Sequence, residues 1–408
     1  MSSQTNAVPA PAGRHGLPPQ PRPPRQRWSI LAAVAVALVA LVAVVVVVLP
    51  RWQEGQLPMP PRSRVASGTS HTCALTTGGG VKCWGANHFG QLGNGSTAPS
   101  AVPVDVRSLE AGVVGLSGSG NHTCALTGEG TVKCWGANES GQLGNGSTDN
   151  SGVPVDVAGL GPGVLQVSAG ASHTCALTRS RTVLCWGTNG TGELGTGGTE
   201  ASAIPVPVKG LPAGSTAVDV GNGFTCVVFT GSTVRCWGDN GDGQLGTGDR
   251  TGRLLWETVS TLPPSSVLSV GDAHACAVAS DGAVACWGTN RAGQLGISMA
   301  GTGSLTPIVV PGLPQGGVTA VSAGYNRTCG VASGSVVCWG GAMDAAAAEK
   351  AGPQAVAELK GVTEISVGTF HVCAATAQAV SCWGENSNGQ LGDGTTGASE
   401  VPVVSLVL

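Results

Sequence analysis

The sequence has 408 residues, of which 66 are glycine, and only 11% are charged. This composition disfavours long solvated helices and favours short strands joined by tight turns. The net charge of −3 is uneven, because residues 1–50 hold four arginines and no acid, whereas residues 51–408 hold 16 basic and 23 acidic residues. Nucleic-acid binding depends on neutralising phosphates, so the acidic main body excludes a general attraction to nucleic acid.

An uncharged apolar run of 21 residues, 29–49, lies near the start of the chain. As a helix it would extend about 32 Å, which matches the hydrocarbon core of a bilayer. With Trp28 and Trp52 at its ends, it predicts a transmembrane anchor over residues 28–52. The alternative is a cleaved secretory signal, which would leave a secreted protein. The run is longer than such signals usually are and lacks an Ala-x-Ala cleavage site.

The anchor divides the chain into segments with different compositions. Residues 1–27 are rich in proline and arginine and predict a disordered tail. The arginines before the anchor favour a tail inside the cytoplasm and a main body outside it. Residues 53–62 are interpreted as a stalk, and residues 63–408 as one repeat domain.

The repeat domain contains seven copies of one unit. Each copy approximates Val-Ser-x-Gly-x-x-His-Thr-Cys-Ala-Leu-Thr, then Val-x-Cys-Trp-Gly-x-Asn-x-x-Gly-Gln-Leu-Gly-x-Gly, then Pro-Val-x-Val. The steps between successive Cys-Trp-Gly tripeptides are 51, 51, 51, 50, 52 and 44 residues. A fixed period of this length indicates a repeat architecture in which each unit packs on its neighbours. The tripeptides begin at Cys83, Cys134, Cys185, Cys236, Cys286, Cys338 and Cys382.

Each unit predicts four short strands. In chain order they carry Val-x-Val-Ser, the first cysteine, the second cysteine, and Pro-Val-x-Val, with Gly-rich hairpin turns such as 128–130 between the second and third. One four-stranded sheet cannot cover both of its faces, but seven sheets arranged radially can. The expected fold is therefore all-β: a seven-bladed β-propeller of four-stranded blades, preceded by one N-terminal transmembrane helix.

The motifs Gly-x-x-His-Thr, Trp-Gly-x-Asn and Gly-Gln-Leu-Gly, at about 50 residues per unit, resemble the repeats of the regulator of chromosome condensation family. The resemblance covers residues 63–408 and implies a closed seven-bladed propeller. We also expect strands from the two ends of the array, at 64–67 and 402–404, to share a blade, because closure removes exposed sheet edges.

Every unit contains two cysteines, separated by ten residues in the first five units and nine in the last two. If Cys124 faces Cys134, the hairpin ends in a three-residue turn, and if Cys329 faces Cys338 it ends in a two-residue turn, so both separations keep the cysteines opposite. Facing residues lie within disulfide range. Buried free thiols are the alternative. The expected disulfides are Cys73–Cys83, Cys124–Cys134, Cys175–Cys185, Cys226–Cys236, Cys276–Cys286, Cys329–Cys338 and Cys373–Cys382.

A zinc site is a second alternative for these cysteines. Zinc ligands usually show Cys-x₂₋₄-Cys spacing, which is absent from the sequence. A histidine stands two residues before the first cysteine in five units, but the fourth and sixth units have Phe224 and Arg327 there. We therefore expect no metal site.

The best candidates for partner binding are positions where the chain departs from its own repeat. The fourth unit carries an insertion over 250–262 with Arg253, Leu255 and Trp256, and tryptophan and arginine are frequent interface anchors. The alternative for Trp256 is that it covers a local core. Two further candidates are the His88-Phe89 pair in the first unit and Met343, in the segment that replaces the Gly-Gln-Leu-Gly loop of the sixth.

The sequence contains no motif of a nucleophile elbow, phosphate loop or zinc protease, so we expect neither an enzyme nor a cofactor. The predicted function is a non-catalytic, extracytoplasmic scaffold, with a monomeric ectodomain, that presents propeller loops to a protein partner. The resemblance implies an alternative, because one branch of that family exchanges guanine nucleotide on a GTPase and another inhibits β-lactamases. The chain would then regulate or inhibit an enzyme.

Overall fold

The computed structural model describes residues 62–297, 303–314, 317–341 and 352–407. These residues form one compact unit in which all regular elements are strands. The tail, the anchor over 28–52 and nearly all of the stalk lie outside the described residues, as does Met343. No helix among the described residues could span a membrane.

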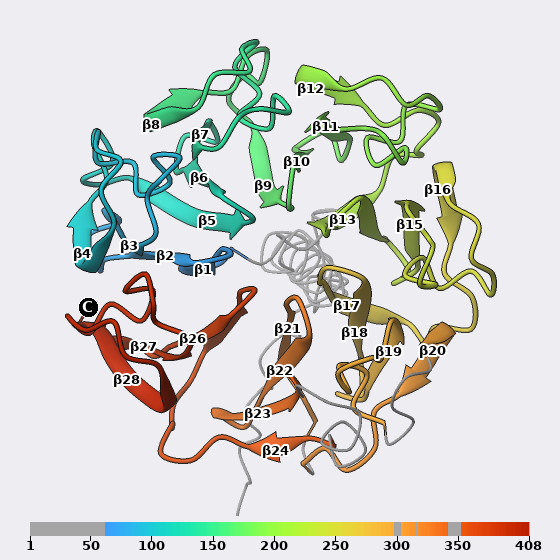
Figure 1. Ribbon diagram of the computed structural model, residues 1–408. Helices are drawn as coiled ribbons and strands as arrows, with labels where there is room; N and C mark the ends of the chain where they lie inside the picture. Colours follow the sequence, from blue (N-terminus) through green and yellow to red (C-terminus); the bar gives the residue numbers. More distant parts are fainter. Residues whose placement is uncertain (1–61, 298–302, 315–316, 342–351, 408) are drawn as a thin grey trace, which may run out of the picture. The chain divides into compact units, whose positions relative to one another are not determined.

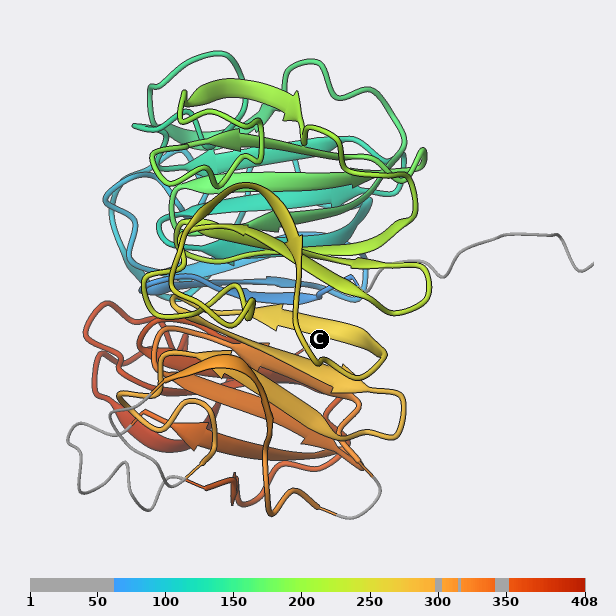
Figure 2. The same ribbon diagram turned by 90° about the vertical axis from the view of Figure 1, so that its right-hand side faces the viewer.

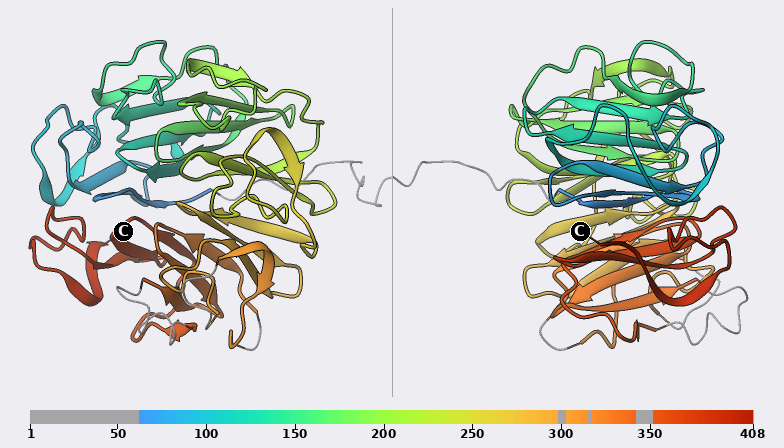
Figure 3. Two further views of the ribbon diagram at one scale, coloured as in Figure 1. Left: turned by 45° about the vertical axis from the view of Figure 1, so that its right-hand side comes forward. Right: turned by 90° about the vertical axis from the view of Figure 1, so that its left-hand side faces the viewer.

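The strands assemble into seven four-stranded antiparallel sheets, which form the blades of a ring, as Figure 1 shows. In Figures 2 and 3 the strands run between the two faces of the ring. The expected seven-bladed propeller is thus confirmed. Blades 1 to 4 are β1 (Val65–Ser67), β2 (His71–Leu75), β3 (Val81–Gly85) and β4 (Ser100–Asp105); β5 (Val113–Ser119), β6 (His122–Thr127), β7 (Val132–Gly136) and β8 (Ser151–Asp156); β9 (Val164–Ala169), β10 (His173–Thr178), β11 (Val183–Gly187) and β12 (Ser202–Pro207); and β13 (Ser215–Val220), β14 (Phe224–Phe229), β15 (Val234–Gly238) and β16 (Arg253–Thr258).

Blades 5 to 7 follow the same plan. They are β17 (Ser265–Val270), β18 (His274–Ala279), β19 (Val284–Gly288) and β20 (Ser304–Val309); β21 (Ala320–Ala323), β22 (Arg327–Ala332), β23 (Ser335–Gly340) and β24 (Gln354–Ala355); and β25 (Glu364–Val367), β26 (His371–Ala375), β27 (Ala379–Gly384) and β28 (Ser399–Val407).

The expectation that the two ends of the array share a blade is wrong. Every sheet consists of four strands consecutive in the chain, so β1 belongs to blade 1 and β28 to blade 7. The ring closes instead through contacts between these complete blades. Ser67 N–H donates to Ser366 Oγ at 2.9 Å, and the Trp84 indole N–H donates to the carbonyl of Gln390 at 2.9 Å.

The middle hairpin of each blade has the register expected from the cysteine spacing. Cys124 faces Cys134 and Leu126 faces Val132, and in blade 6 Cys329 faces Cys338. The two cysteines of every blade are joined, with Cα atoms 4.0–4.1 Å apart. All of these cysteines are buried in the blade cores except Cys338, which is partly buried.

The tryptophan of each Cys-Trp-Gly motif packs between two blades. Trp135 of blade 2 contacts Leu92 and Cys83 of blade 1, and its indole N–H donates to the carbonyl of Gln91 at 2.9 Å. Gly93 has φ +66°, and the Cβ atom of any other residue at this position would lie only 2.8 Å from the indole nitrogen of Trp135. The second glycine of Gly-Gln-Leu-Gly is therefore required by the close approach of the indole.

A buried histidine–threonine pair links each of five blade junctions. His122 Nε2 lies 2.9 Å from Thr174 Oγ1, and the Thr174 hydroxyl donates to the carbonyl of Gln142 at 2.9 Å. Because the hydroxyl has one proton, Nε2 must be the donor in this contact. Burial lowers the pKa of His122 to about 3. The other pairs are His71–Thr123, His173–Thr225, His274–Thr328 and His371–Thr72.

The two remaining junctions change both partners together. Phe224 of blade 4 stands where five blades have histidine, and Ala275 of blade 5 stands where the partner threonine would be. Arg327 of blade 6 likewise corresponds to Val372 of blade 7. The histidines therefore link blades, and no group of three or more metal-ligating side chains occurs among the described residues.

Candidate functional site

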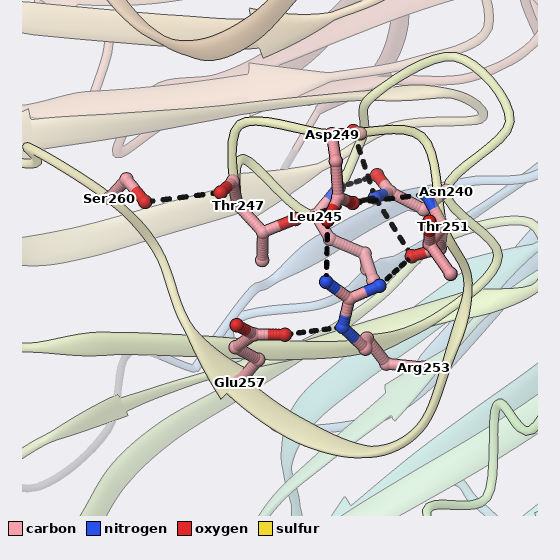
Figure 4. A network of polar contacts seen from close by, with 8 residues as sticks. All are labelled: Asn240, Leu245, Thr247, Asp249, Thr251, Arg253, Glu257 and Ser260. Carbon is pink, nitrogen blue, oxygen red and sulfur yellow. Dashed lines mark hydrogen bonds and ion pairs between the residues drawn. The ribbon is translucent and has the colours of Figure 1, made fainter.

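The sequence analysis interpreted residues 250–262 of the fourth unit as an insertion, and this is wrong: the segment replaces the usual repeat residues without adding any, because Gly238 pairs with Arg253 just as Gly187 pairs with Ser202 in blade 3. The segment forms the end of the loop after β15 and the outer strand β16 of blade 4. Asn240, at the base of the loop, accepts from the Leu245 N–H and donates to the carbonyls of Asp249 and Thr251 (Figure 4). Equivalent asparagines hold the same loop in other blades, as Asn87 does in blade 1. The loop of blade 4 is therefore a fixed platform, built by the repeat motif itself.

Arg253, the first residue of β16, lies between two carboxylates. It donates to Asp249 Oδ2 at 2.7 Å and to Glu257, and also to the carbonyl of Thr251 (Figure 4). The hydrogen bond from Arg253 is the main cause that lowers the pKa of Asp249, and the two carboxylates raise the pKa of Arg253. The arginine is thus already neutralised within its own strand and loop.

Trp256 is half-buried on the same strand. Its ring centre lies 4.3 Å from the guanidinium carbon of Arg235, and that carbon also lies 4.4 Å from the centre of the Phe229 ring. Trp256 also packs on the core cluster that contains Val208. The indole therefore covers a local core and shields a cation, which is the alternative weighed for it from the sequence.

Leu254 and Leu255 are the apolar side chains that β16 leaves open, each 42% exposed. Arg253 is half-buried beside them. Of the other candidates, His88 is exposed and Phe89 half-buried, but both belong to blade 1, which blades 2 and 3 separate from blade 4 in the ring. The structure therefore groups Arg253, Leu255 and Trp256 and places His88 and Phe89 apart from them.

The sequence analysis missed the central channel. A cavity of about 320 Å³ is lined by the innermost strands, including β13 and its Asp219. Asp219 accepts hydrogen bonds from the Ser168 hydroxyl and the Val270 N–H, both at 2.8 Å. Burial nevertheless raises the pKa of Asp219 to about 6. A signal was available, because five other repeats place a serine opposite their first cysteine: Ser117, Ser168, Ser269, Ser322 and Ser366.

Two exposed aromatic side chains were also missed. Tyr325, which borders the channel, is 45% exposed and Phe370 is 50% exposed. They occupy the turns between the first and second strands of blades 6 and 7, at the position of the Gly-x-x-His motif, which reads Gly-Tyr-Asn-Arg in blade 6. Both departures were visible in the sequence as large residues at positions where other repeats have small or polar ones.

The fold and its rim define a class of protein: a closed repeat propeller whose variable surface lies on loops and outer strands. Models of the regulator of chromosome condensation (RCC1) repeat match residues 79–126, 129–177, 182–228 and 281–331, and a second set matches 63–91, 113–142, 164–193, 216–244 and 267–294. Together the two sets cover 63–244 and 267–331. The chain belongs to the RCC1 repeat family.

Named relatives share only part of their length with this chain. The human E3 ubiquitin-protein ligase HERC2 is 37% identical over 193 residues, which are 46% of this chain and 4% of the ligase. The ultraviolet-B receptor UVR8 of Arabidopsis thaliana is 33% identical over 208 residues, 50% of this chain and 47% of the receptor. The match thus spans less than half of either relative.

Solved structures show the same fold at low identity. Prp20p of Saccharomyces cerevisiae, described with its binding properties to Gsp1p and histones, superposes with a TM-score of 0.73 at 21% identity, covering 81% of this chain and 87% of that one. Human WBSCR16 superposes with a TM-score of 0.65 at 21% identity, covering 77% and 86%.

Proposed function

We propose that this chain is a non-catalytic scaffold that presents its propeller to a protein partner outside the cytoplasm. The seven disulfides carry the proposal. All 14 cysteines are paired, one bond per blade, and such bonds persist in oxidising compartments. The apolar run 29–49 supports export, with residues 1–27 inside, 28–52 in the membrane and 53–62 as a stalk.

The partner site that the geometry supports best is the rim of blade 4. The exposed Leu254 and Leu255 lie on a strand whose charge is balanced by its own ion pairs, and whose loop is held by Asn240. Apolar side chains on a fixed frame lose little conformational entropy when a partner covers them. This rim therefore combines exposure with rigidity.

The location is tested by counting free thiols. Protein taken from the cells that produce it is denatured without reductant and treated with a maleimide reagent. We expect almost no modified cysteine. In a second experiment, a protease added to intact cells should cleave the chain on the propeller side of the membrane. Extensive thiol labelling would contradict an oxidising compartment.

The binding site is tested by affinity capture with the full-length chain. Leu255→Asp should remove the captured partner, because a buried carboxylate without a counter-ion opposes the contact. Val102→Asp is the matched control, since Val102 is 51% exposed at the same position of β4 in blade 1. Equal recovery with both variants would exclude the rim of blade 4.

A further inference from the structure

Proline occupies one position on the outer edge of six blades. In blade 1 this residue is Pro103, directly before Val104, which faces Cys83. The same register places proline directly before the partner of the second cysteine in the other blades except blade 4. These prolines are Pro103, Pro154, Pro205, Pro307, Pro353 and Pro402.

The hydrogen bonds show which way the backbone points at this position. Val106 N–H donates to the carbonyl of Val81 at 3.1 Å, so positions 104 and 106 face β3. In an antiparallel ladder the backbone N–H and C=O of one residue point to one side of the strand, and those of the next residue point to the other side. The backbone groups of Pro103 and Asp105 therefore point away from β3, toward the open edge of the sheet. Proline at an outward position removes the free N–H that an added strand would need.

Blade 4 is the exception. Val259 N–H donates to the carbonyl of Val234 at 3.0 Å, so the outward positions of β16 are 256 and 258. They hold Trp256 and Thr258. Blade 3, in contrast, has proline at both equivalent positions, Pro205 and Pro207.

The outward groups of β16 are partly occupied by the neighbouring blade. Gly197 N–H, from the loop of blade 3, donates to the carbonyl of Leu254 at 3.1 Å. Across the described residues, no backbone group accepts a hydrogen bond from the N–H of Trp256 or Thr258. Two N–H groups and two carbonyls therefore lie unpaired along an exposed strand end.

We propose that β16 accepts an extended segment of a protein partner, which adds to blade 4 as a fifth strand. The proposal rests on the scaffold function proposed above and specifies its mode of recognition. Backbone hydrogen bonds to positions 256 and 258 provide the register, and the exposed Leu255 provides an apolar contact on the other face.

Charge indicates one feature of the added segment. In blades 1 and 2, Lys82 and Lys133 pair with Asp105 and Asp156 on the outer strand at 2.6 Å. Arg235 holds the same position in blade 4, but it faces Thr258 and has no carboxylate within ion-pair distance among the described residues. An acidic side chain opposite Thr258 on the added strand would lie in the same cross-strand row and supply the missing charge.

A second copy of this chain is a poorer occupant. Pairing of two six-residue strands, with only two outward residues free on each, buries far less than the roughly 1,200 Å² of a stable protein interface. A flexible peptide needs no such area on this edge alone, because the rest of its partner protein can contact other surfaces.

The test uses the full-length chain and a phage-displayed library of linear peptides of about twelve residues. Selected peptides are synthesised, and their affinities are measured by calorimetry for the wild type, Thr258→Pro and Thr258→Val. We expect acidic and apolar residues in the selected peptides. Thr258→Pro should weaken binding at least about tenfold, since the N–H donor of residue 258 is lost and the proline ring occupies space that the added strand needs, and Thr258→Val by less than about twofold.

Folding and geometry each have a control. Pro207 shows that the equivalent position of blade 3 accommodates proline, and the thermal unfolding of Thr258→Pro should stay close to that of the wild type. N-methylation of the peptide amides should abolish binding at alternate positions only, because one side of an added strand faces β16.

Three results would overturn strand addition. They are Thr258→Pro binding within twofold of the wild type, a library that yields no peptide, and a dimer of this chain that Thr258→Pro dissociates. The proposed scaffold function fails separately. If the native partner is lost with Leu255→Asp but kept with Thr258→Pro, the scaffold stands and the mode of recognition is wrong.

Discussion

Amino-acid replacements follow different rules at the hub of this propeller, meaning the buried junctions between blades, and at its rim, meaning the outer strands and their loops. At the hub, the buried His122 of blade 2 bonds Thr174 of blade 3, and where the histidine is replaced the residue across the junction is replaced as well, as in Phe224 and Ala275. At the rim, Trp256 replaces a proline without a matching change in another blade. A buried polar group needs its partner, whereas an exposed one has water. Paired replacement therefore marks structure here, and unpaired replacement marks the surface open to function.

The largest expected effect is the loss of folding stability at low pH, which is caused by the buried histidines of the hub. Burial lowers the pKa of the five junction histidines to about 3 or 4, from 6.5. Below pH 6.5 the unfolded chain binds protons that the folded chain does not, so stability falls with pH from 6.5 to about 4. Each histidine contributes about 1.4 kcal/mol per pH unit in this window. Urea unfolding between pH 7 and 5 should show a loss of several kcal/mol, and a flat profile would contradict buried neutral imidazoles.

The next effect has the opposite sign and comes from Asp219. Its folded pKa of about 6 lies above the unfolded value of 3.8, so its contribution to stability is present below pH 3.8 and is lost as the pH rises to about 6. We expect a loss of up to about 2 kcal/mol, limited by hydration from the channel. The difference in unfolding free energy between wild type and Asp219→Asn should therefore change across pH 4 to 6. Comparing the two proteins cancels the histidine contributions.

A double-mutant cycle sharpens the comparison at one junction. His122→Phe alone leaves the Thr174 hydroxyl oxygen without a donor, and Thr174→Ala alone leaves the buried imidazole N–H unpaired. We expect each to cost about 1–3 kcal/mol and the double variant to cost less than their sum by at least about 1 kcal/mol. Additive costs would show that His122 and Thr174 are not energetically coupled, and paired replacement across a junction would then have no energetic reason.

The smallest effect belongs to the rim. Lys82 and Asp105 form an ion pair at 2.6 Å, but the aspartate side chain is 76% exposed. The same cycle with alanine at both positions should give a coupling below about 1 kcal/mol, and added salt should reduce it. A coupling as large as that of the His122–Thr174 pair would remove the distinction between hub and rim.

Most of the fold could be predicted because the repeat signals are local. Strand order, hairpin register and the facing of Cys124 and Cys134 all follow from spacing within one unit. The manner of closure could not be predicted, since a repeat can be cut at any strand without changing its period. The role of His122 was also missed, because its partner lies 52 residues away on another blade and nothing local identifies it.

For the candidate site, the sequence analysis identified the departures from the repeat but not their meaning. Arg253 and Trp256 were selected as frequent anchors, yet the structure engages one with Asp249 and the other with Arg235. What distinguishes blade 4 is the backbone of β16, where the N–H group of residue 256 faces outward without a proline to replace it. Its signal was a missing proline, which is visible only when six other strands are aligned by their register.

Closure without strand exchange has a consequence for chain connectivity. The junction between blades 7 and 1 is built from the same His371–Thr72 and Trp84–Gln390 contacts that join other neighbours, so the ring has no special seam. We expect that new ends of the propeller can be placed in a loop between blades, for example near Gly161, if a linker joins β28 to β1. Such circular permutants should refold to the same ring, because the contacts between neighbouring blades do not depend on which blade comes first in the chain.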